Sequence, residues 1–396
     1  MRLTERKVVG FTCASHTMLH VAETYYAGLL LYIAADFHAS LETMGNIGLP
    51  FYSIFGATAP LAGWAAGRFG SFRTLSIFLF GAAVSVPLIA LSHSLWQLTI
   101  PLTMLGFFMG LYHPAGLSGI SRLSRRPGRA LGFHGFAGNF GLAAGYFFSV
   151  VLATWLGGSW RGSYALLAIP FVVLGVFVHR LAKLEPEAHE EANRSGRVSM
   201  PLDVHALVVL FILIGINGIL YRMILTFLPA RLALVFHDPA THLGVDPRLM
   251  GSVVNSAFFL VGAFGQLSSG YLSEHISLSK LLTGIFVISG ICLIILGRGG
   301  MAAVAIAGFC FGVCFFATQP VVNGLLSRLT PHNKHGMIYG LSAFFTFGVG
   351  AAGAPIGGVI AERLSVGALC VVAGMVALLL AFGPMFLPHH RMERTA

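Results

Sequence analysis

The chain has 396 residues, of which 56% are apolar and only 10% are charged, and its formal net charge is +10. Soluble domains keep roughly a quarter of their residues charged, so this composition, with a mean hydropathy of +0.82, excludes a soluble domain and is typical of a membrane protein. The positive charge requires no nucleic-acid partner, because basic loops that face an anionic lipid leaflet account for it.

Apolar stretches of the length that an α-helix needs to cross a bilayer follow one another along the whole chain. The charged segment 181–203 interrupts them and separates two sets of six. We therefore predict an all-α membrane protein with a six-helix bundle over residues 1–180, a cytoplasmic linker over 181–203 and a second six-helix bundle over 204–396. The twelve predicted spans cover roughly residues 8–34, 44–66, 74–94, 97–121, 130–155, 162–180, 204–230, 248–272, 281–298, 301–326, 336–360 and 367–387.

Lys and Arg are distributed unevenly between the two ends of these spans. Eighteen lie on the side that carries both termini and five on the opposite side. Because basic residues favour the cytoplasmic side, we expect a multi-pass protein of the inner (cytoplasmic) membrane with both termini in the cytoplasm.

The two halves resemble each other at a constant offset of 206 residues, which places Gly106 on Gly312 and Pro114 on Pro320. These matches fall at equivalent points of equivalent predicted spans. Repeated halves with a substrate site between them are found in many secondary transporters, so we predict pseudo-symmetric bundles.

Glu23 is the one acidic residue deep inside a predicted span. A charge at the bilayer centre costs roughly 2.5–3.5 kcal/mol on insertion scales, so such a residue usually faces a partner or a wet cavity. His16, His20 and Glu23 follow one another at spacings of four and three, which places them on one helical face. We interpret them as proton-coupling residues, and the alternative is a structural ion pair.

Arg222 is the basic residue inside a span, and it lies in the first helix of the second half. We predict that it neutralises Glu23 or binds an anionic group of a substrate, because a guanidinium can form paired hydrogen bonds with such a group; the alternative is an arginine that reaches the outer interface. For His113, packing is an equal alternative to function, and for His134 packing is the favoured interpretation. Further candidates for substrate binding are Tyr25, His113, His134, Asn139, Asn217, Gln319 and Asn323.

The loop after the second predicted span reads GWAAGRFGSFR over residues 63–73. It resembles the signature G-x-x-x-D-R-x-G-R-R of the major facilitator superfamily, although Gly67 stands where the family usually has Asp. A second copy, GYLSEHIS over residues 270–277, keeps the acid but has His in place of Arg. The resemblance implies the two-bundle fold and a conformational latch made by Gly63, Arg68, Gly70, Arg73, Gly270 and Glu274.

Three further segments resemble the fosmidomycin-resistance branch of that superfamily: HVAETY over 20–25, GLYHPA over 110–115 and GFHGFAGNFG over 132–141. This resemblance implies efflux of small organic compounds. An antiporter-like stretch falls at 350–358, in the eleventh span, whereas the family has it in the fifth, so the direction of transport stays open.

The sequence thus predicts a secondary active transporter that moves a small organic solute, an anionic one among the candidates, by proton-coupled efflux. We expect no enzymatic activity, no cofactor and no resident metal; the partners are the solute, protons and the lipid bilayer, and the protein is expected to be a monomer. One alternative is a transporter of a transition-metal ion or metal chelate that uses His16, His20 and Glu23 as ligands. A remote alternative is a membrane-embedded metal oxygenase with histidine boxes at His16, His20, His389 and His390.

Overall fold

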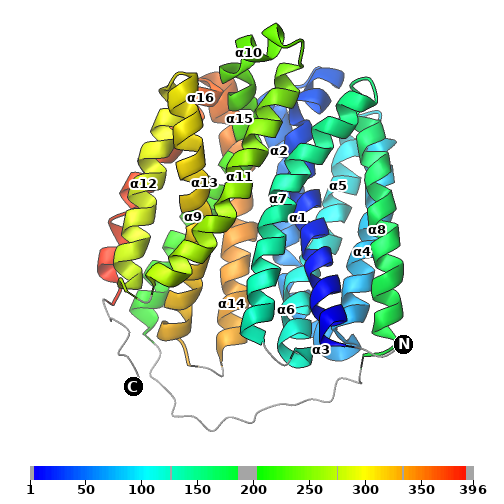
Figure 1. Cartoon of the computed structure of the whole chain (residues 1–396), viewed down its shortest axis with the longest axis vertical. Coiled ribbons are helices and arrows are strands. Elements are labelled where there is room, and N and C mark those ends of the chain that lie inside the picture. Colours follow the sequence, from blue (N-terminus) through cyan, green and yellow to red (C-terminus); the bar gives the residue numbers. More distant parts are fainter. Residues whose placement is uncertain (1–3, 125–126, 186–202, 274, 332–333, 389–396) are drawn as a thin grey trace. The chain divides into compact units, whose positions relative to one another are not determined.

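The computed structural model describes residues 4–124, 127–185, 203–273, 275–331 and 334–388. Within these ranges the chain forms helices joined by turns, and it contains no β-strand (Figure 1). The predicted all-α fold is therefore confirmed. Glu274 of the second loop and the terminal histidines 389 and 390 lie outside the described residues.

The chain divides into two compact units, Met1–Glu191 and Ala192–Ala396. The boundary falls within the segment that we predicted as a linker. The helices of the first unit are α1 (Glu5–Asp36), α2 (Leu41–Ala57), α3 (Ala59–Phe69), α4 (Ser71–Ala90), α5 (Leu95–Gly110), α6 (Tyr112–Leu123), α7 (Pro127–Trp155) and α8 (Trp160–Ala182).

The second unit begins with the long helix α9 and ends with a short helical turn. Its α-helices are α9 (Val204–Val235), α10 (His237–His242), α11 (Pro247–Leu272), α12 (Leu278–Arg298), α13 (Met301–Leu329), α14 (His335–Ala343), α15 (Gly353–Arg363) and α16 (Val366–Leu380). A π-helical turn, Phe344–Val349, and a 3-10 turn, Gly350–Ala352, connect α14 to α15, and a last 3-10 turn covers Gly383–Phe386.

Ten helical segments among the described residues are long and apolar enough to cross a membrane. The other two predicted spans coincide with α1 and with α2 followed by α3. With 32 residues, α1 is about 48 Å long, which is enough to cross a membrane. It is missing from the ten because its mean hydropathy is too low, since polar residues occupy its buried face. The second span is divided where Pro60 enters the first turn of α3, since proline lacks the N–H that would continue the helix. The number of twelve spans stays a prediction.

Helices pack in the same pairs within each unit. In the first unit α1 packs along α7, α2 along α5 and α4 along α8; in the second, α9 packs along α15, α11 along α13 and α12 along α16. A Cβ added at Gly106 of α5 would collide with the backbone carbonyl of Phe51, and one at Gly312 of α13 would collide with that of Phe258. The two glycines related by the 206-residue offset therefore serve the same close helix contact in both halves.

The contact between α1 and α7 depends on glycines of α7 (dark blue and teal ribbons in Figure 1). Gly138 faces the ring of His16, Gly141 faces the backbone of Thr17, and Gly145 faces the carbonyl of Val21, which would lie 2.6 Å from an added Cβ. Small residues allow such close approach of membrane helices. This approach fixes the face of α1 that carries His16 and His20 against α7.

A side chain at Gly145 should therefore loosen the first unit. We expect Gly145→Val to lower the free energy of unfolding by about 1–3 kcal/mol, because the new methyl groups overpack the contact with α1. The matched control is Gly132→Val in the same helix, where an added Cβ has no neighbour within 4 Å. Thermal unfolding of the purified proteins in detergent measures the difference, and equal unfolding temperatures for the two variants would contradict the proposed contact.

Candidate functional site

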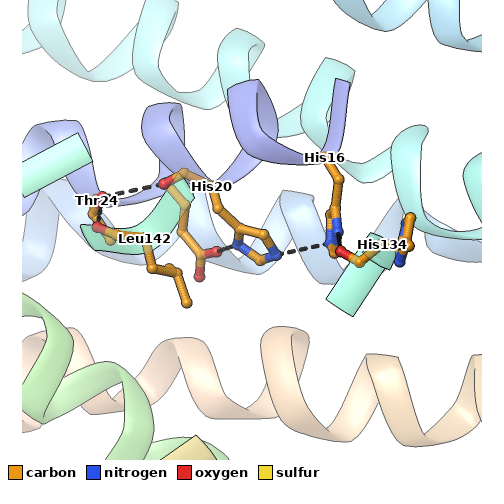
Figure 2. Close-up of polar contacts among 6 residues, drawn as sticks. His16, His20, Thr24, His134 and Leu142 are labelled. Atoms are coloured by element: carbon orange, nitrogen blue, oxygen red, sulfur yellow. Dashed lines mark hydrogen bonds and ion pairs between the residues drawn. The ribbon is translucent and has the colours of Figure 1, made fainter. Parts of the chain in front are cut away.

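A continuous row of hydrogen bonds runs along α1 and ends on α7 (Figure 2). Nδ1 of His20 lies 2.6 Å from Oε2 of Glu23, and Nε2 of His20 lies 3.0 Å from Nε2 of His16. Nδ1 of His16 then donates to the backbone carbonyl of His134 at 2.7 Å. The spacing of three and four residues places these side chains on one face, as the sequence indicated.

The row requires one more proton than its groups carry in their simplest states. Each of its three contacts, Glu23 to His20, His20 to His16 and His16 to the carbonyl of His134, needs a hydrogen between its two atoms. A carboxylate and two neutral imidazoles supply only two such hydrogens. Hydrogen bonds at all three contacts would thus need one further proton, on Glu23 or on one of the two rings.

The side chains of this row are buried. Glu23 has an exposed fraction of 0%, and His16 and His20 are each 6% exposed. A charge buried in this way is costly unless it is paired. One further proton on the row would remove its net charge, because it would balance the carboxylate of Glu23.

Three aromatic side chains of α6 and α7 surround His16. The ring of His134 stacks on it with centroids 3.8 Å apart, and the ring of Tyr112 lies parallel at 5.1 Å. The Tyr112 hydroxyl donates to the carbonyl of Thr12, so Nε2 of His134, 3.0 Å away, donates to the Tyr112 oxygen. The ring of His113 lies 5.3 Å from that of His16, nearly perpendicular to it. Figure 2 shows His16 between His20 and His134.

Three of these imidazoles are close enough to hold one metal ion. His16, His20 and His113 each offer a nitrogen, and the three nitrogens lie within 4.8 Å of one another. A carboxylate and a backbone carbonyl, the groups bonded to His20 and His16, are the usual outer partners of metal-bound histidines. The metal alternative named His16, His20 and Glu23; in the structure the three nitrogens that lie together include that of His113, and Glu23 contacts Nδ1 of His20.

Arg222 lies in α9 of the second unit and is 1% exposed. Its guanidinium carbon is 5.5 Å from the centroid of the neighbouring Tyr221 ring. The alternative for Arg222 was a side chain that reaches the outer interface. The buried position of the side chain does not favour this alternative. The predicted pairing of Arg222 with Glu23 stays a prediction.

Tyr25 was predicted to bind substrate, but its position favours packing. Its side chain has an exposed fraction of 0%, and its hydroxyl donates to the carbonyl of Ser163 at 3.1 Å. A second contact, 2.8 Å, joins it to the Ser163 hydroxyl. Tyr25 therefore ties α1 to α8.

The polar residues of the other helices that we predicted to bind substrate differ in their exposure to solvent. Asn139 of α7 is buried and Asn217 of α9 is half-buried, whereas Gln319 and Asn323 of α13 are exposed. The side-chain amide of Gln266 donates to Gln319 at 3.2 Å. The exposed pair on α13 is thus accessible for a solute, whereas Asn139 lies within the first unit.

Sequence reasoning missed Glu185, which follows α8. Its carboxylate accepts hydrogen bonds from the backbone N–H groups of Ser71 and Phe72, both at 2.8 Å, and so caps the start of α4. Arg122 of α6 lies 3.4 Å from the same carboxylate and donates to the Ser71 hydroxyl. We refer to Ser71, Phe72, Arg122 and Glu185 as the Glu185 cluster. It brings an acid to the loop in which Gly67 replaces the acid of the family signature.

Of the remaining positions of the predicted latch, Gly70 lies next to this cluster. Gly70 connects α3 to α4 with a φ of 95°, a conformation that favours glycine. An added Cβ there would lie 2.8 Å from Oε2 of Glu185. Gly63, Arg68 and Arg73 are exposed. In the second unit, Gly270 has no neighbour within 4 Å of an added Cβ.

Comparison with known proteins gives relatives across the whole chain. The chain is 24% identical over 405 residues to the fosmidomycin resistance protein of Escherichia coli (strain K12), covering 97% of this chain and 93% of that protein.

Solved transporter structures share the fold at low sequence identity. A nucleoside transporter, NupG, solved in a mutant form, superposes with a TM-score of 0.77 at 14% identity, over 96% of this chain and 99% of its own. A POT family transporter in complex with 5-aminolevulinic acid gives a TM-score of 0.73 at 13% identity, over 96% of each chain.

The family model of the Major Facilitator Superfamily matches residues 12–241 and again residues 210–395. These two matches together cover nearly the entire chain. The hypothesis of a membrane-embedded oxygenase is therefore wrong. The chain belongs to the Major Facilitator Superfamily, and it is a membrane transporter rather than an enzyme.

Proposed function

We propose that this transporter exports a small organic solute across the inner membrane by alternating access, in exchange for protons. In this proposal the row Glu23–His20–His16 carries the coupled proton. The observation that supports it best is the hydrogen count: three short contacts require one proton beyond a carboxylate and two neutral imidazoles. The described conformation is then the proton-loaded one.

Removal of that proton would change the row at its middle contact. The Nδ1 atoms of His16 and His20 would keep their hydrogens, because both face strong oxygen acceptors. The two Nε2 atoms, 3.0 Å apart, would then face each other with lone pairs only, which is repulsive in a site with little water. The unloaded row would separate at this point and leave an uncompensated carboxylate. Such a state favours a conformation that admits water or a cation.

The solute is proposed to be a small organic anion that uses Arg222. A buried guanidinium can present two parallel N–H donors to a carboxylate or phosphonate. The name of the relative from Escherichia coli makes fosmidomycin the first compound to test. Asn217, Gln319 and Asn323 remain candidates for further contacts with the solute.

The remaining expectations belong to the same proposal. The excess of Lys and Arg on one side favours the inner membrane with both termini in the cytoplasm. The protein acts as a monomer without a resident metal or cofactor. The loop latch is proposed to use Glu185 in the first half, in place of the missing acid at Gly67, and Glu274 in the second.

The first test is Glu23→Gln in proteoliposomes. Glutamine has the shape of the carboxylic acid but cannot release a proton, so we expect pH-gradient-driven flux to fall at least about tenfold. Exchange of labelled solute for unlabelled solute should survive, because it needs no net proton movement. The matched control, Asp238→Asn, makes the same chemical change at an exposed position of α10 and should keep gradient-driven flux. A Glu23→Gln variant that remained fully coupled to the gradient would disprove the assigned proton carrier.

A second candidate function is transport of a divalent transition-metal ion. The three nitrogens of His16, His20 and His113 support it, since imidazole suits zinc, nickel and copper. If the solute is an organic anion, liposomes that contain the protein should take up no more Zn²⁺, Co²⁺ or Ni²⁺ than protein-free liposomes do. Metal uptake that is saturable, and that His113→Gln abolishes, would favour the metal candidate instead. A metal-sensitive dye inside the liposomes measures the uptake.

A further inference from the structure

A groove of about 530 Å³ lies on the surface of the first unit, between α4, α5 and α8. Residues of all three helices line it. Its lining is apolar over most of its length and includes Ile77, Phe80, Val84, Met104 and Phe108. Since α4, α5 and α8 all belong to membrane-crossing segments, this surface lies at the depth of the hydrocarbon.

Two glycines shape the groove. An added Cβ at Gly81 of α4 would collide with the ring of Phe108, so that ring lies directly on the α4 backbone. Gly175 of α8 leaves room for Phe80 in the same way. With both rings folded against the helices, Ile77 and Val84 line an open furrow and are 46% and 54% exposed. Such a furrow suits a flexible apolar chain.

One end of the groove is basic. Arg73 stands in the first turn of α4, and His179 and Lys183 come from the last turn of α8 and the residue that follows it. The bonds from Ser71 and Phe72 to Glu185 hold these two helix ends together. All these residues lie on the side that carries the excess of Lys and Arg.

The described acid beside these helix ends, Glu185, is bonded to other groups. The Glu185 carboxylate is occupied by two backbone N–H groups and by Arg122. Among the described residues, neither Arg73 nor Lys183 takes part in an ion pair of the first unit.

We propose that this groove binds an anionic phospholipid of the cytoplasmic leaflet. One acyl chain occupies the apolar furrow, and Arg73 and Lys183 hold the phosphate and the anionic headgroup. Basic pockets between membrane helices on the cytoplasmic side are suited to such headgroups, and each basic residue near the surface strengthens the attraction. A zwitterionic phospholipid offers the same acyl chain but no net negative charge, so the groove discriminates by headgroup. The site is separate from the proton row and does not depend on its role.

The test measures lipid binding to the delipidated, full-length protein by native mass spectrometry, with phosphatidylglycerol and phosphatidylethanolamine of identical acyl chains. We expect the wild type to prefer phosphatidylglycerol. The double variant Arg73→Gln/Lys183→Gln should weaken phosphatidylglycerol binding at least about fivefold while leaving phosphatidylethanolamine binding unchanged. The matched control, Lys280→Gln/Lys334→Gln, removes the same charge from exposed positions of the second unit and should keep the preference.

A second variant tests the acyl part of the groove. Ile77→Trp places a large side chain in the furrow without altering charge, and it should weaken binding of both lipids. Elution as a single species in size-exclusion chromatography shows that each variant is folded. Equal phosphatidylglycerol affinities in the groove double variant and the matched control would overturn the proposal, as would unchanged binding in a folded Ile77→Trp protein.

Discussion

The rest of the first unit depends on one constraint: a carboxylate with no exposure to water lies within a membrane-crossing bundle. Glu23 can occupy that position only with a compensating partner. His20 is that partner at 2.6 Å, His16 continues the row, and the carbonyl of His134 ends it on α7. The row is therefore a contact that joins two helices, and in the proposed mechanism the same atoms also hold the coupled proton.

The close packing of α1 and α7 is the condition for this row. His16 reaches the carbonyl of His134 because Gly138 has no side chain, and the α1 backbone lies close to α7 because Gly141 and Gly145 have none. The second unit uses the corresponding contact between α9 and α15, where Gly353 faces the carbonyl of Ile219. The repeat thus preserves a type of helix contact, while the ionisable residues that it supports differ between the halves.

The sequence contains enough information for the all-α membrane fold and the common face of His16, His20 and Glu23, because these follow from hydropathy and helical periodicity. It does not contain the partners of a side chain across helices. Tyr25 lies in the same motif as Glu23, so the sequence predicts a substrate contact for it. In the structure its hydroxyl forms hydrogen bonds with Ser163. Likewise, His113 replaces Glu23 in the possible metal set because the carboxylate approaches His20 from the opposite ring nitrogen.

Glu185 was missed for a related reason: it belongs to the acidic start of a segment that reads as a solvated linker. Its contacts give α6 a particular position in the fold. That helix, twelve residues and about 18 Å long, begins with Tyr112 and His113 beside the proton row and ends near Arg122, which reaches Glu185. A helix transmits displacement along its axis with little loss, because its backbone hydrogen bonds resist compression. A rearrangement at His16 that moved Tyr112 would therefore also act on Arg122, the start of α4 and the beginning of the linker. The proton row and the Glu185 cluster are distant in sequence, but each contacts a residue at one end of α6.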